Sequence, residues 1–492
     1  MLFTLRAACF RRRGQHFILL VLCNMKTETE IAEKPSSVFW LLIVFLTVVF
    51  LTGGSSRGDA QSLAILFPWA ILACGTALVT LQREHVRQHA SLFIGFGVLL
   101  ALTFIYLVPL PSTLWQNFPG RTDIVGIDRT VGMGNNPRPI TLMPNAGWLS
   151  AFSLFTPIAV FLFGVQLKRH DLYRLLPIFI ILGAVSGLLG LLQIAGTPAG
   201  PLYFYRITNN DSAVGLFANR NHAATLLACV LPMLAVFASA GAGRHDVSKS
   251  RQLIAAAIAL VLIPLILVTG SRAGLVLAVA GLSGASLLYR QPVWKQDFGS
   301  QSQKWKWLTA PKLAVAAVLC LGLLTVYFSR AEAIDRLFGQ SMDADSRSIF
   351  WTESLKLFYK YFPFGSGAGA FGSAYQIIEK DYMLTSYYLN RAHNDWVELA
   401  VTFGMLTILF VGVAVIQFLR GTIRLWISRD RNRRSVTFGR MAGIIIAMMG
   451  VASITDYPLR NPTMMCLFSV AILWFNASAR FESRDSRVVS AT

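Results

Sequence analysis

The sequence predicts an all-α integral membrane protein with about twelve transmembrane helices and one large polar loop. Three observations lead to this fold class. Of the 492 residues, 54% are hydrophobic and only 14% are charged, whereas a soluble domain has about 25% charged residues. The mean hydropathy is +0.55. The charged residues are gathered between apolar runs that approach the roughly 20 residues a helix needs to cross the hydrocarbon core.

Twelve apolar runs are candidates for membrane spans. The basic tail that precedes them, residues 1–36, contains the apolar stretch Phe17–Cys23, which is too short to cross a membrane. The predicted spans cover residues 37–54, 62–81, 91–110, 147–167, 172–195, 222–240, 252–269, 273–289, 312–328, 398–419, 439–456 and 462–477. The large polar loop, residues 329–397, lies between the ninth and the tenth of them.

The distribution of basic residues indicates how the chain crosses the membrane. If the N-terminal tail is cytoplasmic, 29 of the 44 lysines and arginines fall in cytoplasmic segments. Seven of the other 15 lie in the loop 329–397, and the positive-inside rule has little force for so long a loop. The net charge of +20 is therefore a topology signal, and we expect no nucleic-acid partner. Both termini should be cytoplasmic, with the long loop on the opposite, outer side.

Only two of the seven histidines fall on the outer side. His222 begins a predicted span, whereas His393 lies in the polar sequence Arg391–Trp396 that precedes another apolar run. Histidine changes its charge near neutral pH, which suits it to act as a general base. His393 is therefore the candidate catalytic base of the outer loop. The alternative is that it caps a helix or lies at the membrane interface.

The outer loop has a pattern of its own. Ser348–Phe362 places large apolar residues at helical spacing, which predicts an amphipathic helix on the membrane surface. The glycines of Gly365–Gly372 follow, and they match a dinucleotide fingerprint in spelling only, because they come after a helix and not a strand. The six cysteines lie in the tail or in apolar runs, so we expect no disulfide and no cysteine-bound metal.

Two outer sites carry arginine. Arg272 lies in the tight junction Gly270–Gly274, at a depth where an arginine is costly unless an anion or a carboxylate meets it. Its guanidinium fork matches phosphate oxygens, although a lone arginine at a span end also snorkels to the headgroups. The second site is the sequence Asn219-Arg220-Asn221 at a predicted helix start, preceded by Arg206. A helix start with such residues is suited to bind an anion.

Three segments together resemble the O-antigen ligase and O-antigen polymerase family. They are Ser271–Gly274 at the start of a span, Pro363–Gly367 after the amphipathic helix, and Ala392–Leu399 leading into the next span. The resemblance covers about residues 200–415. It implies a catalytic core at 196–420 that includes the loop 329–397, between N-terminal transmembrane helices at 37–195 and C-terminal helices with a cytoplasmic tail at 421–492.

The resemblance implies a glycosyltransferase of the bacterial inner membrane with its active site on the periplasmic side. Members of the family take a glycan from undecaprenyl diphosphate and transfer it to an acceptor hydroxyl, without a metal or another cofactor. The acceptor is a lipid A core sugar in ligases, a further glycan repeat in polymerases, and a protein Ser or Thr in the oligosaccharyltransferase relatives. We favour a ligase or polymerase of a surface polysaccharide, and the sequence does not choose between them.

The resemblance also assigns roles. Arg272 matches the family's arginine that is thought to contact the diphosphate, where a cation stabilises the leaving group. His393 matches the family's loop histidine and is the candidate general base. Asn394, Asp395 and Glu398 follow it as supporting residues, and either carboxylate is a candidate for orienting the imidazole.

One departure concerns the second contact to the diphosphate. Many family members have an arginine just before the first glycine, where this chain has Ser212-Ala-Val-Gly215, and many have proline at the position of Arg220. Arg206 or Arg220 is then the candidate for that contact, with Asn219 and Asn221 as supporting residues.

A secondary transporter or a flippase of a lipid-linked glycan is the alternative function. Such a protein should carry charged residues in mid-span and two comparable halves. Here the predicted spans are almost free of charge, and the polar residues are concentrated in one asymmetric outer loop. The enzyme is therefore favoured over the transporter.

Overall fold

The computed structural model describes residues 34–55, 60–240, 245–291, 342–381, 389–428 and 434–489. The regular secondary structure of these residues is helical, apart from a single isolated β-bridge between Leu110 and Arg138. Eight helical segments are long and apolar enough to cross a membrane, and three shorter apolar helices accompany them. The predicted class, an all-α membrane protein, is confirmed. The predicted span 312–328 lies outside the described residues, so the total of twelve stays a prediction.

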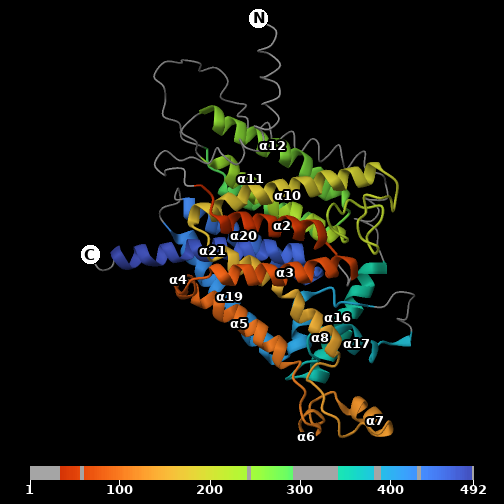
Figure 1. Cartoon of the computed structure of the whole chain (residues 1–492). Coiled ribbons are helices and arrows are strands. Elements are labelled where there is room, and N and C mark those ends of the chain that lie inside the picture. Colours follow the sequence, from red (N-terminus) through yellow and green to blue (C-terminus); the bar gives the residue numbers. More distant parts are fainter. Residues whose placement is uncertain are drawn as a thin grey trace, which may run out of the picture.

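The apolar helices run side by side across the view of Figure 1. They are α2 (Ser37–Thr52), α3 (Ala60–Thr80), α5 (Ala90–Ile105), α8 (Pro144–Ser153) continued by α9 (Phe155–Gly164), α10 (Arg169–Ala195), α11 (Arg220–Ser239), α12 (His245–Val268), α13 (Arg272–Leu288), α19 (Met405–Ile427), α20 (Arg434–Thr455) and α21 (Pro462–Val489). At 1.5 Å per residue, the 27 residues of α10 are long enough for a bilayer core of about 30 Å.

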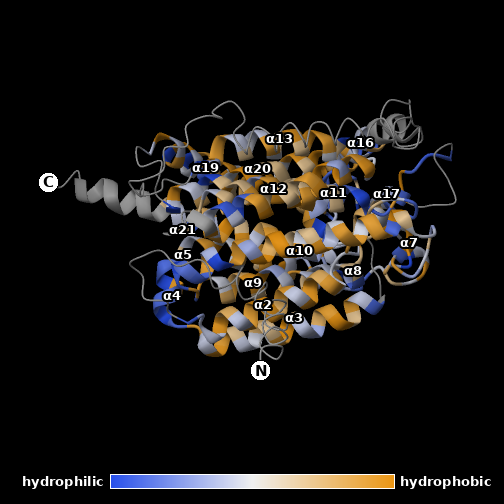
Figure 2. Cartoon of the chain, turned by 90° about the horizontal axis from the view of Figure 1, so that it is seen from above, coloured by the Kyte–Doolittle hydropathy of each residue, from blue (hydrophilic) through white to orange (hydrophobic). Residues whose placement is uncertain are grey.

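The remaining elements lie at the two ends of this bundle. They are α4 (Arg83–Gln88) at one end, and α6 (Ser112–Trp115), α7 (Thr122–Thr130), α16 (Met342–Tyr361), α17 (Phe371–Gln376), α18 (Asp395–Phe403) and the 3₁₀ turn η2 (Pro458–Arg460) at the other. Hydrophilic residues gather around α4 and around α17, with hydrophobic residues along the helices between them (Figure 2). The end that holds α16, α17 and α18 is called the α18 end below.

The central helix of the bundle is α11. Almost all of its residues are buried, and it packs against α10, α12, α13 and α20. The contact with α13 is close because a Cβ added to Gly274 would lie 2.5 Å from the Cβ of Ala224. Small residues allow helices to approach in this way inside a membrane. The first turn of α13, with Arg272, is thereby held beside the start of α11.

Substituting Gly274 tests this contact. Gly274→Val should destabilise the protein by about 1–3 kcal/mol, since the added atoms overlap Ala224 and the helices must separate. The measurement is the thermal unfolding temperature in detergent. Gly412→Val in α19 is the matched control, because a Cβ there meets no atom within 4 Å. Equal unfolding temperatures for the two variants would contradict the close packing of α11 on α13.

The predicted span 398–419 begins too early in the sequence. Helix α18 ends at Phe403, the backbone turns at Gly404 with φ 55°, and the spanning helix α19 begins only at Met405. The backbone N–H of Met405 donates to the carbonyl of Pro363 at 2.9 Å. The apolar residues at the end of α18 therefore pack against the segment that contains Pro363 and Gly365, and they are separate from the membrane helix α19.

The predicted amphipathic helix 348–362 is present as the larger part of α16. The glycine turn that follows it packs closely on other segments and does not form a nucleotide-binding loop. Gly367 has φ 93° and lies against Thr141, and Gly369 has φ 75° and lies against Ala146, so a side chain at either position would collide. Gly365 similarly lies against Thr402 near the end of α18. The turn thus joins the outer segment to the start of α8 and to α18.

Candidate active site

His393 lies immediately before α18. Its backbone has φ 49°, in the left-handed region that few residues other than glycine adopt. The next residue, Asn394, is the N-cap of α18, and its side chain accepts the backbone N–H of Val397 at 3.1 Å. The imidazole of His393 is 29% exposed, so a substrate can reach it.

The carboxylate that faces His393 belongs to Asp456, which directly follows α20. Nδ1 of His393 lies 3.6 Å from Oδ1 of Asp456, and the same oxygen accepts the backbone N–H of Tyr457 at 2.9 Å. Oδ2 accepts the side-chain amides of Asn219 at 3.1 Å and Asn221 at 2.7 Å. A carboxylate has about four acceptor positions. Three are filled by these donors, and the fourth faces the imidazole.

Asp456 is ionised in this arrangement. Burial acts to raise the pKa of its carboxyl group, but the pairing with His393 and the neighbouring His222 lower it more, so that the pKa lies well below the usual range. An ionised carboxylate beside Nδ1 favours the tautomer with the proton on that nitrogen. The lone pair of Nε2 is then free to accept a proton from a substrate.

Two helix starts meet at this pair, and a third, that of α13, lies beside one of them. Asn219 caps α11, His393 precedes α18, and α13 begins beside α11 through Gly274. The ring of Tyr457 packs against the imidazoles of both His393, at 5.1 Å between centroids, and the buried His222, at 5.3 Å. Because the start of a helix carries a partial positive charge, this end of the bundle favours an anion.

The segment that leads into α11 is held by α10. The side-chain oxygen of Gln193 accepts the backbone N–H groups of Val214 and Gly215 at 3.1 and 2.7 Å. The hydroxyl of Ser186 accepts the N–H of Leu216 at 3.1 Å. These buried hydrogen bonds fix the approach to Asn219, and through it the position of Asp456.

The three candidate arginines lie on different segments: Arg272 on α13, Arg220 at the start of α11 and Arg206 in the loop before α11. Arg272 is the first residue of α13, where its side chain is exposed and the N-cap Ser271 accepts the N–H of Gly274 at 2.9 Å. Arg220 is half-buried between the two asparagines that bind Asp456. Arg206 is exposed in the loop before α11. Arg220 is thus next in sequence to both asparagines that bind Asp456, whereas Arg206 belongs to the preceding loop.

Neither Asp395 nor Glu398 orients the imidazole, contrary to expectation. Asp395 accepts the Ser453 hydroxyl at 3.0 Å and the backbone N–H of Leu459 at 3.1 Å. Oε1 of Glu398 accepts a hydrogen bond from Nη1 of Arg391 at 2.7 Å. Both carboxylates are buried and belong to the packing of α18 on the segment after α20. Asp395 and Glu398, although close to His393 in sequence, bind other groups. The carboxylate near the imidazole comes from Asp456, which is distant in sequence.

Arg460 connects the two carboxylates. Its Nε lies 3.3 Å from Oδ1 of Asp395, and its Nη2 lies 3.5 Å from Oε1 of Glu398. Burial raises the pKa of Asp395 to about 6 although Arg460 acts to lower it. For Glu398 burial also acts upward, but Arg460 and Arg391 outweigh it, and the pKa is lowered. The residues around His393 are thus fixed by a buried ion network.

Removing Arg460 should destabilise the protein in a pH-dependent way. Arg460→Met removes the arginine beside the buried Asp395, whereas Glu398 keeps Arg391, and the expected loss is about 3–5 kcal/mol at pH 8. The pKa of Asp395 is already raised, so its protonated form is favoured by folding and stability is lost as pH rises through about 6. The loss should be smaller at pH 5. Thermal unfolding at both pH values measures it, with the exposed Arg424→Met as control; an equal loss at both would contradict it.

Asp456, Tyr457 and Arg460 were not among the residues chosen from the sequence. Asp456 is the last residue of the predicted span 439–456, and Tyr457 and Arg460 lie in the short junction after it; Asp456 is one of only 24 acidic residues in the chain. An acidic residue at the end of a span on the same side as His393 was the available signal. This signal could not identify His393 as the partner of Asp456, because no local sequence pattern relates the two positions.

Across the described ranges, no three His, Cys, Asp or Glu side chains form a group that could hold a metal ion. Residues 254–412 match the family model described as O-Antigen ligase. This match confirms the resemblance indicated by the three sequence segments. It includes Arg272 and His393 and leaves Arg206, Arg220 and Asp456 outside. A search of curated proteins finds no match.

Proposed function

We propose that this membrane protein is a glycosyltransferase that moves a glycan from undecaprenyl diphosphate to an acceptor hydroxyl at the periplasmic face. The match of residues 254–412 to the O-antigen ligase family and the apolar helices support this class. The observation that carries the proposal is the pairing of His393 with Asp456 at the meeting point of two helix starts, those of α11 and α18. It combines a base for an alcohol with a positive environment for a diphosphate.

The proposed reaction is a direct displacement. Nε2 of His393 takes the proton of the acceptor hydroxyl as that oxygen attacks the anomeric carbon of the donor sugar. The bond from this carbon to the diphosphate oxygen breaks, and the diphosphate leaves with the electron pair. The anomeric centre is inverted. Asp456 stabilises the imidazolium that forms, since its carboxylate is ionised and adjacent to Nδ1.

The diphosphate requires cations on the other side of the reacting carbon. Arg272 is the proposed principal contact because it is exposed at the first turn of α13 beside α11. Arg220 is the proposed second contact, ahead of Arg206, because its neighbours bind Asp456. Their guanidinium groups and the helix starts together stabilise the negative charge that grows on the leaving group.

Arg272→Lys separates phosphate recognition from simple contact with the headgroups. Lysine keeps the charge but loses the fork, which should lower transfer by roughly 10- to 100-fold, as expected for one charge-assisted hydrogen bond of about 1.5–3 kcal/mol. The assay is transfer from a lipid-linked glycan by the purified protein. Arg290→Lys, beyond the opposite end of α13, is the control. Near-normal activity of Arg272→Lys would mean that Arg272 only snorkels.

A deletion strain tests the function itself. We expect its surface-polysaccharide profile, by gel and linkage analysis, to change in one of two ways. Lipid A core without attached polymer, with lipid-linked polymer accumulating, identifies a ligase; single repeats on an intact acceptor identify a polymerase. An unchanged polysaccharide profile with glycoproteins lacking their glycans would point to a protein Ser or Thr as acceptor. If neither polysaccharides nor glycoproteins change, the transferase proposal is wrong.

A further inference from the structure

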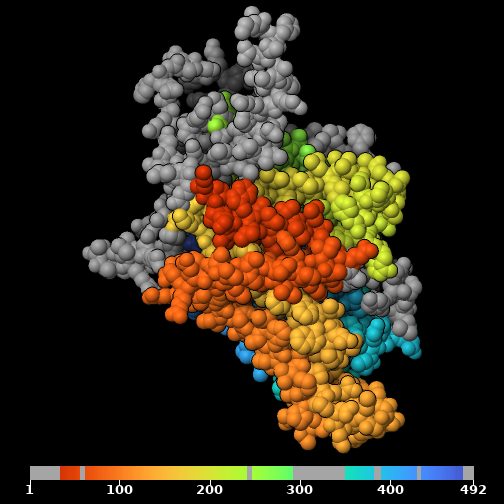
Figure 3. All heavy atoms as spheres, viewed as in Figure 1, coloured from red at the N-terminus to blue at the C-terminus, as the bar shows by residue number. Residues whose placement is uncertain are grey.

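Residues 106–143 form a small lobe at the α18 end of the bundle, called the α6–α7 lobe below. It stands out beyond the end of α5 in Figures 1 and 3. The lobe is internally fixed: Leu110 and Arg138 exchange backbone hydrogen bonds at 2.9 and 3.1 Å, and Arg138 pairs with the buried Asp128 at 2.5 Å. Trp115 is buried and donates to the carbonyl of Asn136 at 3.0 Å. Its surface side chains are therefore displayed by a defined framework.

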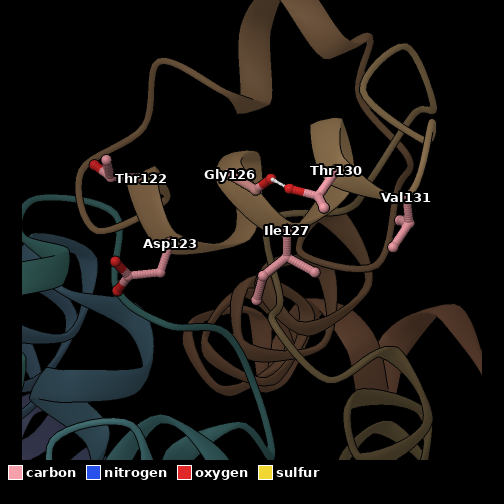
Figure 4. A pocket seen from close by; sticks show the side chains of 6 residues that line it. All are labelled: Thr122, Asp123, Gly126, Ile127, Thr130 and Val131. Carbon is pink, nitrogen blue, oxygen red and sulfur yellow. Dashed lines mark hydrogen bonds between the residues drawn. The ribbon is translucent and has the colours of Figure 1, made fainter.

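This framework exposes large apolar side chains. Besides Val108 at the start of the lobe, four of them are about half exposed or more: Leu114 at 54%, Ile127 at 62%, Val131 at 60% and Met133 at 48%. Ile127 lies on α7 and Val131 is the residue that ends it, one turn further on, and Figure 4 shows both on a hollow along this helix. Neighbouring exposed apolar side chains on a fixed surface, as Ile127 and Val131 are, mark an interaction site. These four residues are called the lobe's apolar face.

The apolar face continues the lipid-facing surface of α5. Ile94, Val98 and Ile105 of α5 are exposed on the outside of the bundle, and Val108, at the start of the lobe, is 51% exposed. The lobe therefore begins where an apolar helix leaves the membrane. Fully burying a side chain such as Ile127 stabilises by about 1.5–3 kcal/mol, so acyl chains beside α5 are a favourable environment for this face.

The charges of the lobe agree with a membrane surface. Asp123 is paired with Lys360 of α16 at 3.0 Å, and Asp128 is paired with Arg138. Arg129 is exposed on α7. A basic residue beside apolar ones is the arrangement that places a helix at the headgroup boundary.

The neighbouring end of α16 adds aromatic rings. Phe118 of the lobe stacks on Phe364 at 4.5 Å between centroids, and Phe362 and Phe364 are 39% and 40% exposed. Aromatic residues are enriched where a membrane protein passes through the interface. A second protein copy fits less well, because a stable interface buries about 800 Å² on each partner and the apolar face has only four large side chains.

We infer that the apolar face of the α6–α7 lobe is inserted among the acyl chains of the leaflet at the α18 end, with Arg129 at its phosphates. The lobe is then an interfacial anchor that fixes the depth of the outer segment, including α16, relative to the lipid surface. This inference does not depend on the proposed catalytic activity.

Spin-label accessibility tests the inference in the full-length protein. A nitroxide is attached at Ile127→Cys, Val131→Cys or Met133→Cys in a cysteine-free background and reconstituted into phosphatidylglycerol–phosphatidylethanolamine vesicles. Collisions with oxygen, which concentrates in lipid, are compared with collisions with a water-soluble nickel chelate. Ile94→Cys on α5 is the lipid reference, and Gln376→Cys on the exposed side of α17 is the water reference.

We expect the lobe labels to resemble Ile94 and to be severalfold less accessible to the nickel chelate than Gln376. Labels as accessible to the chelate as Gln376 overturn the inference. Labels shielded from both reagents, with spin–spin coupling between molecules, also overturn it and identify a second copy as the occupant. The three lobe positions give the same readout, so failure of one variant to insert leaves the test intact.

Discussion

Replacing His393 with asparagine is expected to lower glycan transfer by about 10²–10⁴-fold, the range that a general base contributes. Asparagine is the informative choice because the backbone at this position has φ 49°, and asparagine tolerates the left-handed region better than alanine. The loss can then be attributed to the missing imidazole and not to backbone strain. Transfer is measured with purified protein in vesicles and a lipid-linked glycan donor.

The loss of transfer can be assigned to the missing imidazole only if the His393→Asn variant folds normally. Its thermal unfolding temperature should lie close to that of the wild type, since the imidazole is partly exposed and no direct hydrogen bond to Nδ1 is lost. His85→Asn, at the opposite end of the bundle, is the matched control and should transfer normally. Wild-type rates for His393→Asn at saturating acceptor would remove His393 from the mechanism and leave the helix-cap alternative.

Neutralising Asp456 should cost nearly as much activity as removing the base. In Asp456→Asn the two amides of Asn219 and Asn221 still require an acceptor at the position of Oδ2, so the carbonyl of the new amide must lie there. Its NH₂ group then occupies the position of Oδ1, opposite Nδ1 of His393. An N–H donor at this place favours the proton on Nε2, where it blocks uptake of the acceptor's proton. We expect a loss of roughly 10²–10⁴-fold.

A control is needed because any buried carboxylate contributes to stability. Asp171 is buried at the other end of the bundle, where it pairs with Arg174 at 2.7 Å. Asp171→Asn should lower the unfolding temperature and leave transfer unchanged once the amount of folded protein is equal. If Asp456→Asn also retains full activity per folded molecule, Asp456 is a structural residue and the orientation of the base has another origin.

Most of the bundle could be predicted from local patterns. Apolar runs of the right length located α10, α11 and α12, and amphipathic spacing located α16, because each pattern is a property of consecutive residues. His393 and Asn219, both chosen from the sequence, lie at the same end of the molecule, beside Asp456. Both carry a local signal, a polar group at the start of an apolar run.

The contacts that build the site could not be predicted in this way. Asp456 and His393 are brought together by the packing of α20 against α11 and α18, and no sequence spacing encodes that packing. The break at Gly404 was missed for a related reason: residues 398–419 are apolar on both sides of it, and the turn depends on Pro363 from another segment. Tertiary hydrogen bonds decide both features.

The hydrogen bonds of Asp456 also have a consequence for biosynthesis. The ribosome completes α11, α13 and α18 before Asp456 is made, so a partly synthesised chain already contains His393 and all three candidate arginines. It lacks the carboxylate that the imidazole faces and that ties Asn219 and Asn221 to α20. On the proposed function, the nascent chain is therefore inert towards the lipid-linked glycans around it. Catalytic competence arrives only when the penultimate described helix has entered the membrane.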